Sequence, residues 1–182
     1  MSWINGLLLL LGLIYISWQL SSLAARLDRT HIRRDSALNS LKQHLALRAT
    51  AVARLVASGK LENHVAEKLK DGLEQVLDSS EQSFRDYLSA ESELTGILFD
   101  IFENEQSIEN LLESTQSASL VFELARAAKR VQLARRFHND AVGASQLLHA
   151  KTTVRLFRLA GYTKVPTAVD IDDRVPNALA SL

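Results

Sequence analysis

The chain opens with a hydrophobic run that has almost no polar interruption. Residues 3–18, WINGLLLLLGLIYISW, include only Asn5 and Ser17 as clearly polar side chains. A bilayer-spanning helix needs roughly 20 apolar residues, and no charged side chain precedes Arg26. A soluble helix would show a polar face, and this run has none. The pattern therefore predicts a single transmembrane anchor over residues 1–22.

A cleaved secretion signal is the alternative interpretation of the same run. Signal peptides begin with positively charged side chains, whereas here only the terminal amine precedes the apolar residues. The sequence Ser22-Leu23-Ala24 resembles a cleavage site in its two small outer residues, and nothing else marks it as one. Aromatic residues also stand at both ends of the run, where membrane proteins place interfacial anchors: Trp3, Tyr15 and Trp18. The anchor is favoured, and an exported helical protein stays as the alternative.

The charges beside this anchor predict its orientation. Four arginines follow the span closely, and no Lys or Arg comes before it: Arg26, Arg29, Arg33 and Arg34. Positively charged flanks remain on the cytoplasmic side of a membrane. We therefore expect a single-pass protein of the cell membrane, with its N-terminus outside and its helical body in the cytoplasm.

Beyond the anchor, apolar positions recur with the three/four spacing of an amphipathic helix. The helix is predicted from Leu23 to Ser58, with Gly59 as its terminating residue. Its inward face, which we call the α-stripe, resembles a coiled-coil seam with some charged members. The α-stripe comprises Leu27, His31, Arg34, Leu38, Leu41, Leu45, Arg48, Val52 and Leu55.

Three more helical segments follow. A second helix is predicted over 62–77, and Asp78 to Glu81 offer capping residues for a third that extends to Phe102. Residues 104–119 are polar and ambiguous, and a fourth helix is predicted over 120–159. Helices that each carry one apolar face bury those faces against each other. The predicted fold class is all-α, an antiparallel bundle of three or four long helices behind the anchor.

Charge is balanced over the chain but segregated along it. Residues 26–60 carry a net charge of +6, residues 62–123 carry −12, and residues 124–182 carry +6. Basic helices packed beside acidic ones fit this pattern better than a nucleic-acid surface, which needs an unopposed basic face. No nucleic-acid partner is expected. The chain contains no cysteine, which excludes disulfides and thiolate metal sites.

The densest group of polar side chains is the stretch ARRFHNDAV, residues 134–142. On a helix, His138 and Asp140 point in nearly opposite directions, so they cannot share a proton or a metal ion. Carboxylate-bridged metal centres in bundles use Glu-x-x-His on two helices, and among the five histidines only His31 has a carboxylate, Asp28, three residues earlier. No phosphate-binding or hydrolase motif is present either. We therefore expect no catalytic residues, no metal site and no cofactor, and a structural role for this cluster.

The same stretch is similar to a late-helix motif of the LemA family, approximately A-R-x-x-Y-N-x-A-V. Five positions match it: Ala134, Arg135, Asn139, Ala141 and Val142. His138 stands where the aromatic residue usually does, and Gln146 replaces a later Asn. The order of elements matches along nearly the whole chain, as in a divergent member. The resemblance implies a single-pass membrane protein with a soluble helical bundle, here residues 23–161, an extended tail over 162–182, and no established catalytic residues.

The expected function is that of a membrane-anchored, non-enzymatic scaffold or adaptor. Its partners would be the lipid bilayer and unidentified proteins, or further copies of itself, bound through helical faces. A peripheral lipid-surface module is the alternative from another class, because basic and apolar residues mix in residues 151–162. Its expected headgroup contacts are Lys151, Arg155 and Arg158.

Overall fold

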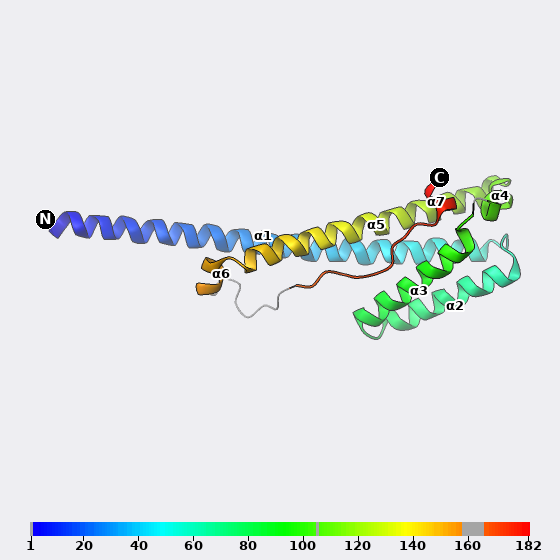
Figure 1. Ribbon diagram of the computed structural model, residues 1–182, viewed down its shortest axis with the longest axis horizontal. Coiled ribbons are helices and arrows are strands. Elements are labelled where there is room, and N and C mark those ends of the chain that lie inside the picture. Colours follow the sequence, from blue (N-terminus) through cyan, green and yellow to red (C-terminus); the bar gives the residue numbers. More distant parts are fainter. Residues whose placement is uncertain (1, 105, 158–165) are drawn as a thin grey trace. The chain divides into compact units, whose positions relative to one another are not determined.

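The computed structural model describes residues 2–104, 106–157 and 166–182. Every regular element within these residues is a helix (Figure 1). The helices are α1 (Ser2–Ala57), α2 (Asn63–Ser80), α3 (Phe84–Phe102), α4 (Gln106–Leu112), α5 (Thr115–His149), α6 (Thr152–Leu156) and α7 (Asn177–Ala180). The predicted all-helical class, with one long apolar N-terminal helix, is confirmed.

The chain packs as two compact units. Unit 1 comprises Met1–Ala37 and Asn139–Ala168, and unit 2 comprises Leu38–His138 and Val169–Leu182. Both α1 and α5 therefore contribute residues to each unit. Each unit is described by itself below.

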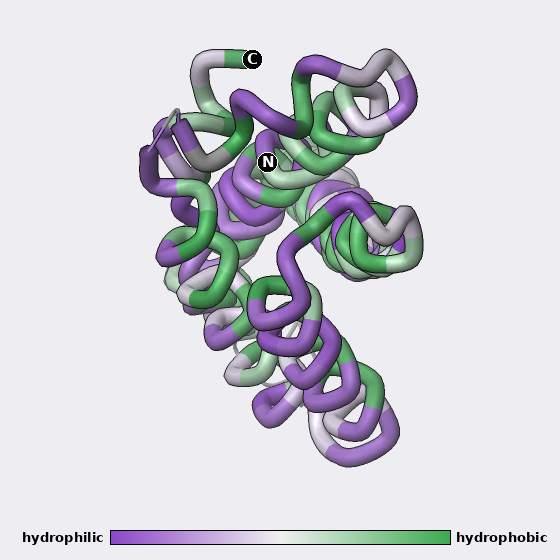
Figure 2. The backbone as a smooth tube through the Cα atoms, turned by 90° about the vertical axis from the view of Figure 1, so that its right-hand side faces the viewer, coloured by the Kyte–Doolittle hydropathy of each residue, from purple (hydrophilic) through white to green (hydrophobic). Residues whose placement is uncertain are grey.

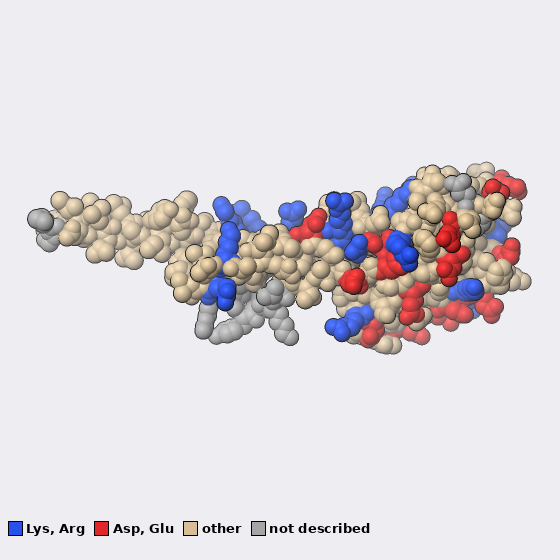
Figure 3. Space-filling model, viewed as in Figure 1, with Lys and Arg blue, Asp and Glu red and all other residues tan. Residues whose placement is uncertain are grey.

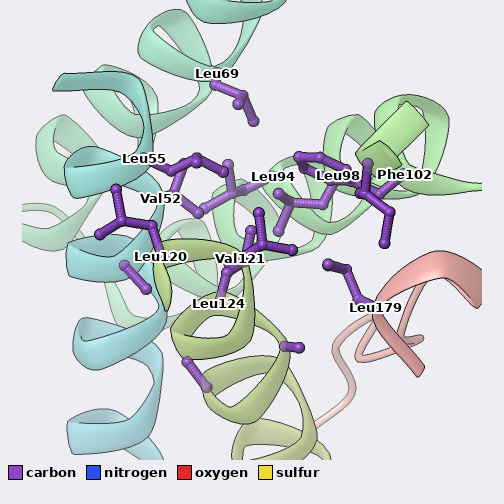
Figure 4. Packing of buried hydrophobic residues seen from close by; sticks show 14 of the residues in the cluster. Val52, Leu55, Leu69, Leu94, Leu98, Phe102, Leu120, Val121, Leu124 and Leu179 are labelled. Atoms are coloured by element: carbon purple, nitrogen blue, oxygen red, sulfur yellow. The ribbon is translucent and has the colours of Figure 1, made fainter. Parts of the chain in front are cut away.

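Unit 2 is built around a large apolar cluster to which six helices contribute. Figure 4 shows side chains from α1, α2, α3, α5 and α7 converging there, and Ile108 and Leu111 of α4 belong to the same cluster. The residues labelled in that view are Val52, Leu55, Leu69, Leu94, Leu98, Phe102, Leu120, Val121, Leu124 and Leu179. The polar stretch that the sequence left ambiguous thus contains a short helix that packs into the core.

A second apolar cluster of unit 2 joins α1, α5 and the C-terminal segment. Leu41 and Leu45 come from α1, Val131 and Ala134 from α5, and Val169 and Ile171 from the segment before α7. The predicted α-stripe is confirmed as the inward face of α1, because its members from Leu41 to Leu55 are all buried. Within unit 2 the segment from 169 to 176 has no regular secondary structure, and the four-residue α7 follows it.

Amphipathic patterning explains why α2 and α3 form a close pair. Their buried faces carry Leu69 and Val76 on α2 and Leu94 and Leu98 on α3, and hydrophilic and hydrophobic segments alternate along the helical turns (Figure 2). Gly72 permits the close approach, since a Cβ there would lie 2.8 Å from Cδ1 of Ile97. Acidic side chains gather on the outside of this pair (Figure 3).

Local chemistry sets the helix ends, and two of them differ from the sequence prediction. Gly59, with φ of 65°, follows α1 as predicted. The predicted capping group for α3 is wrong, because α2 continues through Ser80 and the cap is Ser83, whose hydroxyl accepts from the backbone N–H of Asp86. The predicted fourth helix is also interrupted, since α5 ends at His149 and α6 begins at Thr152.

Candidate membrane anchor and packed polar sites

The beginning of α1, in unit 1, exposes its apolar side chains. From Trp3 to Trp18, the large hydrophobic side chains are between 50% and 91% exposed, and that part of the helix shows no charged atoms in Figure 3. Among the described helices, α1 alone is long and apolar enough to cross a membrane, by length and composition. A secretion signal passes the same test. The core helix of a soluble protein passes it as well, although the described residues bury no part of the apolar window.

The basic residues after this segment also lie in unit 1. Arg26, Arg29 and Arg33 are exposed. Arg34 is less exposed, and its guanidinium lies 2.7 Å from the carboxylate of the adjacent Asp35. The uncompensated positive charge beside the apolar segment therefore comes mainly from the three exposed arginines.

The LemA-like motif residues divide between the two units. In unit 2, Ala134 is buried in the second apolar cluster, and His138 is 3% exposed. In unit 1, Ala141 and Val142 are buried, while Asn139 is half-buried. The motif thus contributes small and apolar side chains, Ala134 and Ala141, to the buried face of α5.

Arg135 of the motif has a partner that the sequence did not suggest. Its Nε donates to a carboxylate oxygen of Asp173 at 2.5 Å, within unit 2. Asp173 is only 8% exposed, so this charge-assisted hydrogen bond fastens the C-terminal segment to α5. Helical spacing alone would place Asn139, four residues later, beside Arg135. The actual partner lies 38 residues further along the chain, beyond the reach of helix spacing rules.

The most deeply buried polar group of unit 2 joins α1 to α3. Arg48 is 2% exposed and Glu91 is fully buried. One guanidinium nitrogen of Arg48 donates to Oε2 of Glu91 at 2.7 Å and to the Glu91 carbonyl oxygen at 3.0 Å, and the other donates to Oγ1 of Thr95 at 2.8 Å. Arg48 was a predicted member of the α-stripe, and a charged member of an apolar stripe signals a buried counter-charge. The sequence could not identify which carboxylate supplies it.

Tyr87 extends this polar group toward the surface. Burial raises the pKa of the Tyr87 phenol well above its usual value, and the nearby Glu91 carboxylate raises that pKa further by charge and by a hydrogen bond. The phenol therefore remains protonated. A protonated phenol beside an ion-paired carboxylate stabilises that carboxylate and provides no base or nucleophile.

A third polar contact anchors the segment before α7. The side chain of Arg174 donates to both carboxylate oxygens of Asp172, and the Asp172 backbone N–H donates to Oγ of Ser92 on α3. The hydrogen bond from Arg174 lowers the pKa of the Asp172 carboxyl, although partial burial opposes this effect. This contact is structural and links two segments of unit 2.

The predicted headgroup contacts are only partly described. Lys151 and Arg155 are exposed in unit 1, where Arg155 belongs to α6, and Arg158 lies outside the described residues. Val154 of α6 is buried, whereas Leu156 and Phe157 are 73% and 49% exposed. Basic and apolar side chains thus occupy the exposed side of one short helix and the residue after it.

Among the residues that the structure describes, no group of three or more His, Asp or Glu side chains is arranged to hold a metal ion. Three of the histidines are in unit 2: His64 is exposed on α2, while His138 is buried on α5 and His44 is half-buried on α1. The other two, His31 and His149, belong to unit 1.

Comparison with known proteins identifies no relative, because no protein-family model, no curated protein and no solved structure matches this chain.

Proposed function

We propose that this chain is a single-pass membrane protein whose helical body acts as a non-enzymatic scaffold or adaptor. The observation that carries the proposal is the exposed apolar beginning of α1. Burying hydrophobic surface is worth about 25 cal/mol per Å², so a run in which every large hydrophobic side chain from Trp3 to Trp18 is at least half exposed favours a lipid environment. The orientation, with the body in the cytoplasm, follows from Arg26, Arg29 and Arg33.

An antiparallel bundle is the arrangement that we propose for the body. In unit 2, Val52 and Leu55 share a cluster with Leu120 and Leu124, whereas the earlier Leu41 shares one with the later Val131. Positions that advance along α1 thus meet positions that go backwards along α5, which supports antiparallel packing of these two helices. The order of elements and the motif of residues 134–142 support placing the chain as a divergent member of the LemA family.

The scaffold role rests on what the α5 surface offers. Phe122, Leu133 and Phe137 are 42–57% exposed on α5 of unit 2, and Arg126 and Lys129 share their side of the helix by spacing. Exposed aromatic and apolar side chains with basic neighbours are typical of protein-binding surfaces.

The membrane proposal is tested by extraction of the full-length protein from cell membranes. An anchored protein should remain in the membrane pellet at alkaline pH and high salt, keep residues 1–22 by mass spectrometry, and dissolve only in detergent. A protein that is released by carbonate, or that has lost these residues, would be an exported or peripheral helical protein instead.

The scaffold role is tested by affinity capture of the detergent-solubilised chain. A variant that carries both Phe122→Glu and Phe137→Glu should lose the proteins that the unaltered chain binds.

A lipid-surface role for α6 is the second candidate, favoured by the exposed Leu156 and Phe157 beside Lys151 and Arg155. Each basic residue near an anionic surface contributes about 1 kcal/mol. A fluorophore at Thr153 of the reconstituted protein should be quenched by nitroxide-labelled lipid. Quenching should increase when anionic lipid replaces neutral lipid and should fall with added salt. Equal quenching in both lipids would leave α6 as an ordinary end of the helical body.

A further inference from the structure

Two histidines from distant parts of the sequence meet in unit 1. Nε2 of His31, on α1, lies 3.1 Å from Nε2 of His149, the last residue of α5, and the ring centroids are 5.5 Å apart. The residues are separated by 118 positions, and both side chains are half-buried. The rings therefore present the same nitrogen to one another while an open side remains toward solvent.

This separation matches that of two ligands on one metal ion. Histidine nitrogens bind Zn²⁺ at about 2.0–2.1 Å, which places two such nitrogens roughly 2.9 Å apart at a right angle and roughly 3.3 Å apart at the tetrahedral angle. The observed 3.1 Å lies between these values.

The charges around the pair are compatible with this role. Arg34, one turn after His31, acts electrostatically on His149, and its guanidinium lies 2.7 Å from the carboxylate of Asp35. Burial lowers the pKa of His149 below its usual value, and the neighbouring His31 and Arg34 lower it further. Neutral imidazole is the form that binds metal ions.

We propose that His31 and His149 form a two-histidine site for a divalent transition-metal ion of the Zn²⁺, Cu²⁺ or Ni²⁺ class, which joins the end of α5 to α1. Imidazole ligands suit these metals. Because no group of three His, Asp or Glu side chains is found among the described residues, water completes the coordination. The sequence rule for carboxylate-bridged centres did not find this site, since that rule needs a carboxylate three residues before each histidine and Gln146 stands there before His149. The inference does not depend on the proposed function.

A direct hydrogen bond between the rings is the competing explanation for the distance. In that arrangement one Nε2 carries a hydrogen and donates it to the other. The pair would then stabilise unit 1 without any response to metal. In the metal site, both Nε2 atoms turn their lone pairs to the ion, and the hydrogens are on the Nδ1 atoms.

The test is titration of ZnCl₂ into the full-length, tag-free protein in detergent micelles, followed by isothermal titration calorimetry. The site predicts about one Zn²⁺ per chain. Mutating a residue that only hydrogen-bonds to a metal ligand already weakens metal binding about 10–100-fold. Replacing a ligand itself should do at least as much, so His31→Gln and His149→Gln should each weaken Zn²⁺ binding at least tenfold. His64→Gln, which changes the exposed histidine of α2, is the matched control and should bind as wild type does.

Electron paramagnetic resonance of the wild-type protein with one equivalent of Cu²⁺ tests the site without any variant, so the result does not depend on whether a variant folds. Coupling to two imidazole nitrogens is expected. Zn²⁺ binding that is absent in wild type, or unchanged in His149→Gln, would overturn the site and leave the direct hydrogen bond. A Cu²⁺ spectrum with one or no imidazole would do the same.

Discussion

The guanidinium of Arg48 lies 2.7 Å from the carboxylate of Glu91, and neither side chain has appreciable contact with solvent. This pair joins α1 to α3 inside the same unit as the main apolar cluster. Desolvation of two buried charges is costly, so the pair adds little to the free energy of unfolding. One buried charge without its partner is less stable than the intact pair or than two apolar side chains in its place. The pair therefore fixes how α3 lies on α1 more than it adds to the free energy of unfolding.

Removing one member of this pair should destabilise the protein severely. Glu91→Leu leaves Arg48 buried without its counter-charge, and such losses cost about 3–5 kcal/mol. The free energy of unfolding is measured by urea titration followed by circular dichroism. The matched control is Glu123→Leu, which removes the partner of Arg54 from a partly exposed ion pair and should cost about 1 kcal/mol or less. A double variant, Arg48→Met with Glu91→Leu, should recover most of the loss; failure to do so would mean that the charge itself is required.

Adjacent positions on α5 should differ sharply in their tolerance of charge. Ala134 is buried in the second apolar cluster, whereas Leu133 is 51% exposed. Ala134→Arg should cost several kcal/mol, because a charge enters a packed apolar contact, and Leu133→Arg should change the free energy of unfolding by about 0.5 kcal/mol or less. The readout is the midpoint of urea unfolding for each variant. Similar midpoints would show that α5 does not pack through this face.

The orientation in the membrane should depend on the arginines after the anchor. A reporter fused after Leu182 should show cytoplasmic activity. Neutral replacements of Arg26, Arg29, Arg33 and Arg34 should produce a mixed orientation, because the charge difference across the span is then lost. Replacing Lys68 and Lys70 of α2, which lie far from the span in sequence, serves as the control. Extracellular activity of the unaltered fusion would contradict the proposed topology.

Stability should fall below about pH 6.5 through His149. Its pKa is lowered in the folded protein by burial, His31 and Arg34, while the unfolded chain keeps the ordinary value of about 6.5. The unfolded state therefore binds more protons between the two values, and folding loses free energy as pH decreases through this window. Melting temperatures at pH 7.5 and 5.5, without added metal, should show a larger difference for wild type than for His149→Gln. Equal differences would show that another group controls the acid response.

The local features of this fold follow from sequence patterns, and the contacts between distant segments do not. The α-stripe predicted the inward face of α1 in unit 2, including the buried Arg48, because helical spacing alone determines which residues share a face. The cap of α3 was missed because Asp78 to Glu81 carry equally good capping side chains, whereas α2 continues to Ser80 and buries Val76 and Ser79. The helix break after His149 was not predicted, because no glycine or proline lies there. The partners Glu91, Asp173 and His149 became visible only once the chain was folded.

The C-terminal segment has a consequence for the order in which the protein can be made. The side chain of Leu179 is fully buried in the same cluster as Val52 of α1. During synthesis the apolar beginning of α1 leaves the ribosome first and is free to engage a membrane at once. The core of unit 2, in contrast, cannot close until residue 179 has emerged, so its helices must wait in a partly packed state with apolar faces uncovered. A chain interrupted shortly before that point would carry the anchor without a finished core, and would be a natural target for quality control at the membrane.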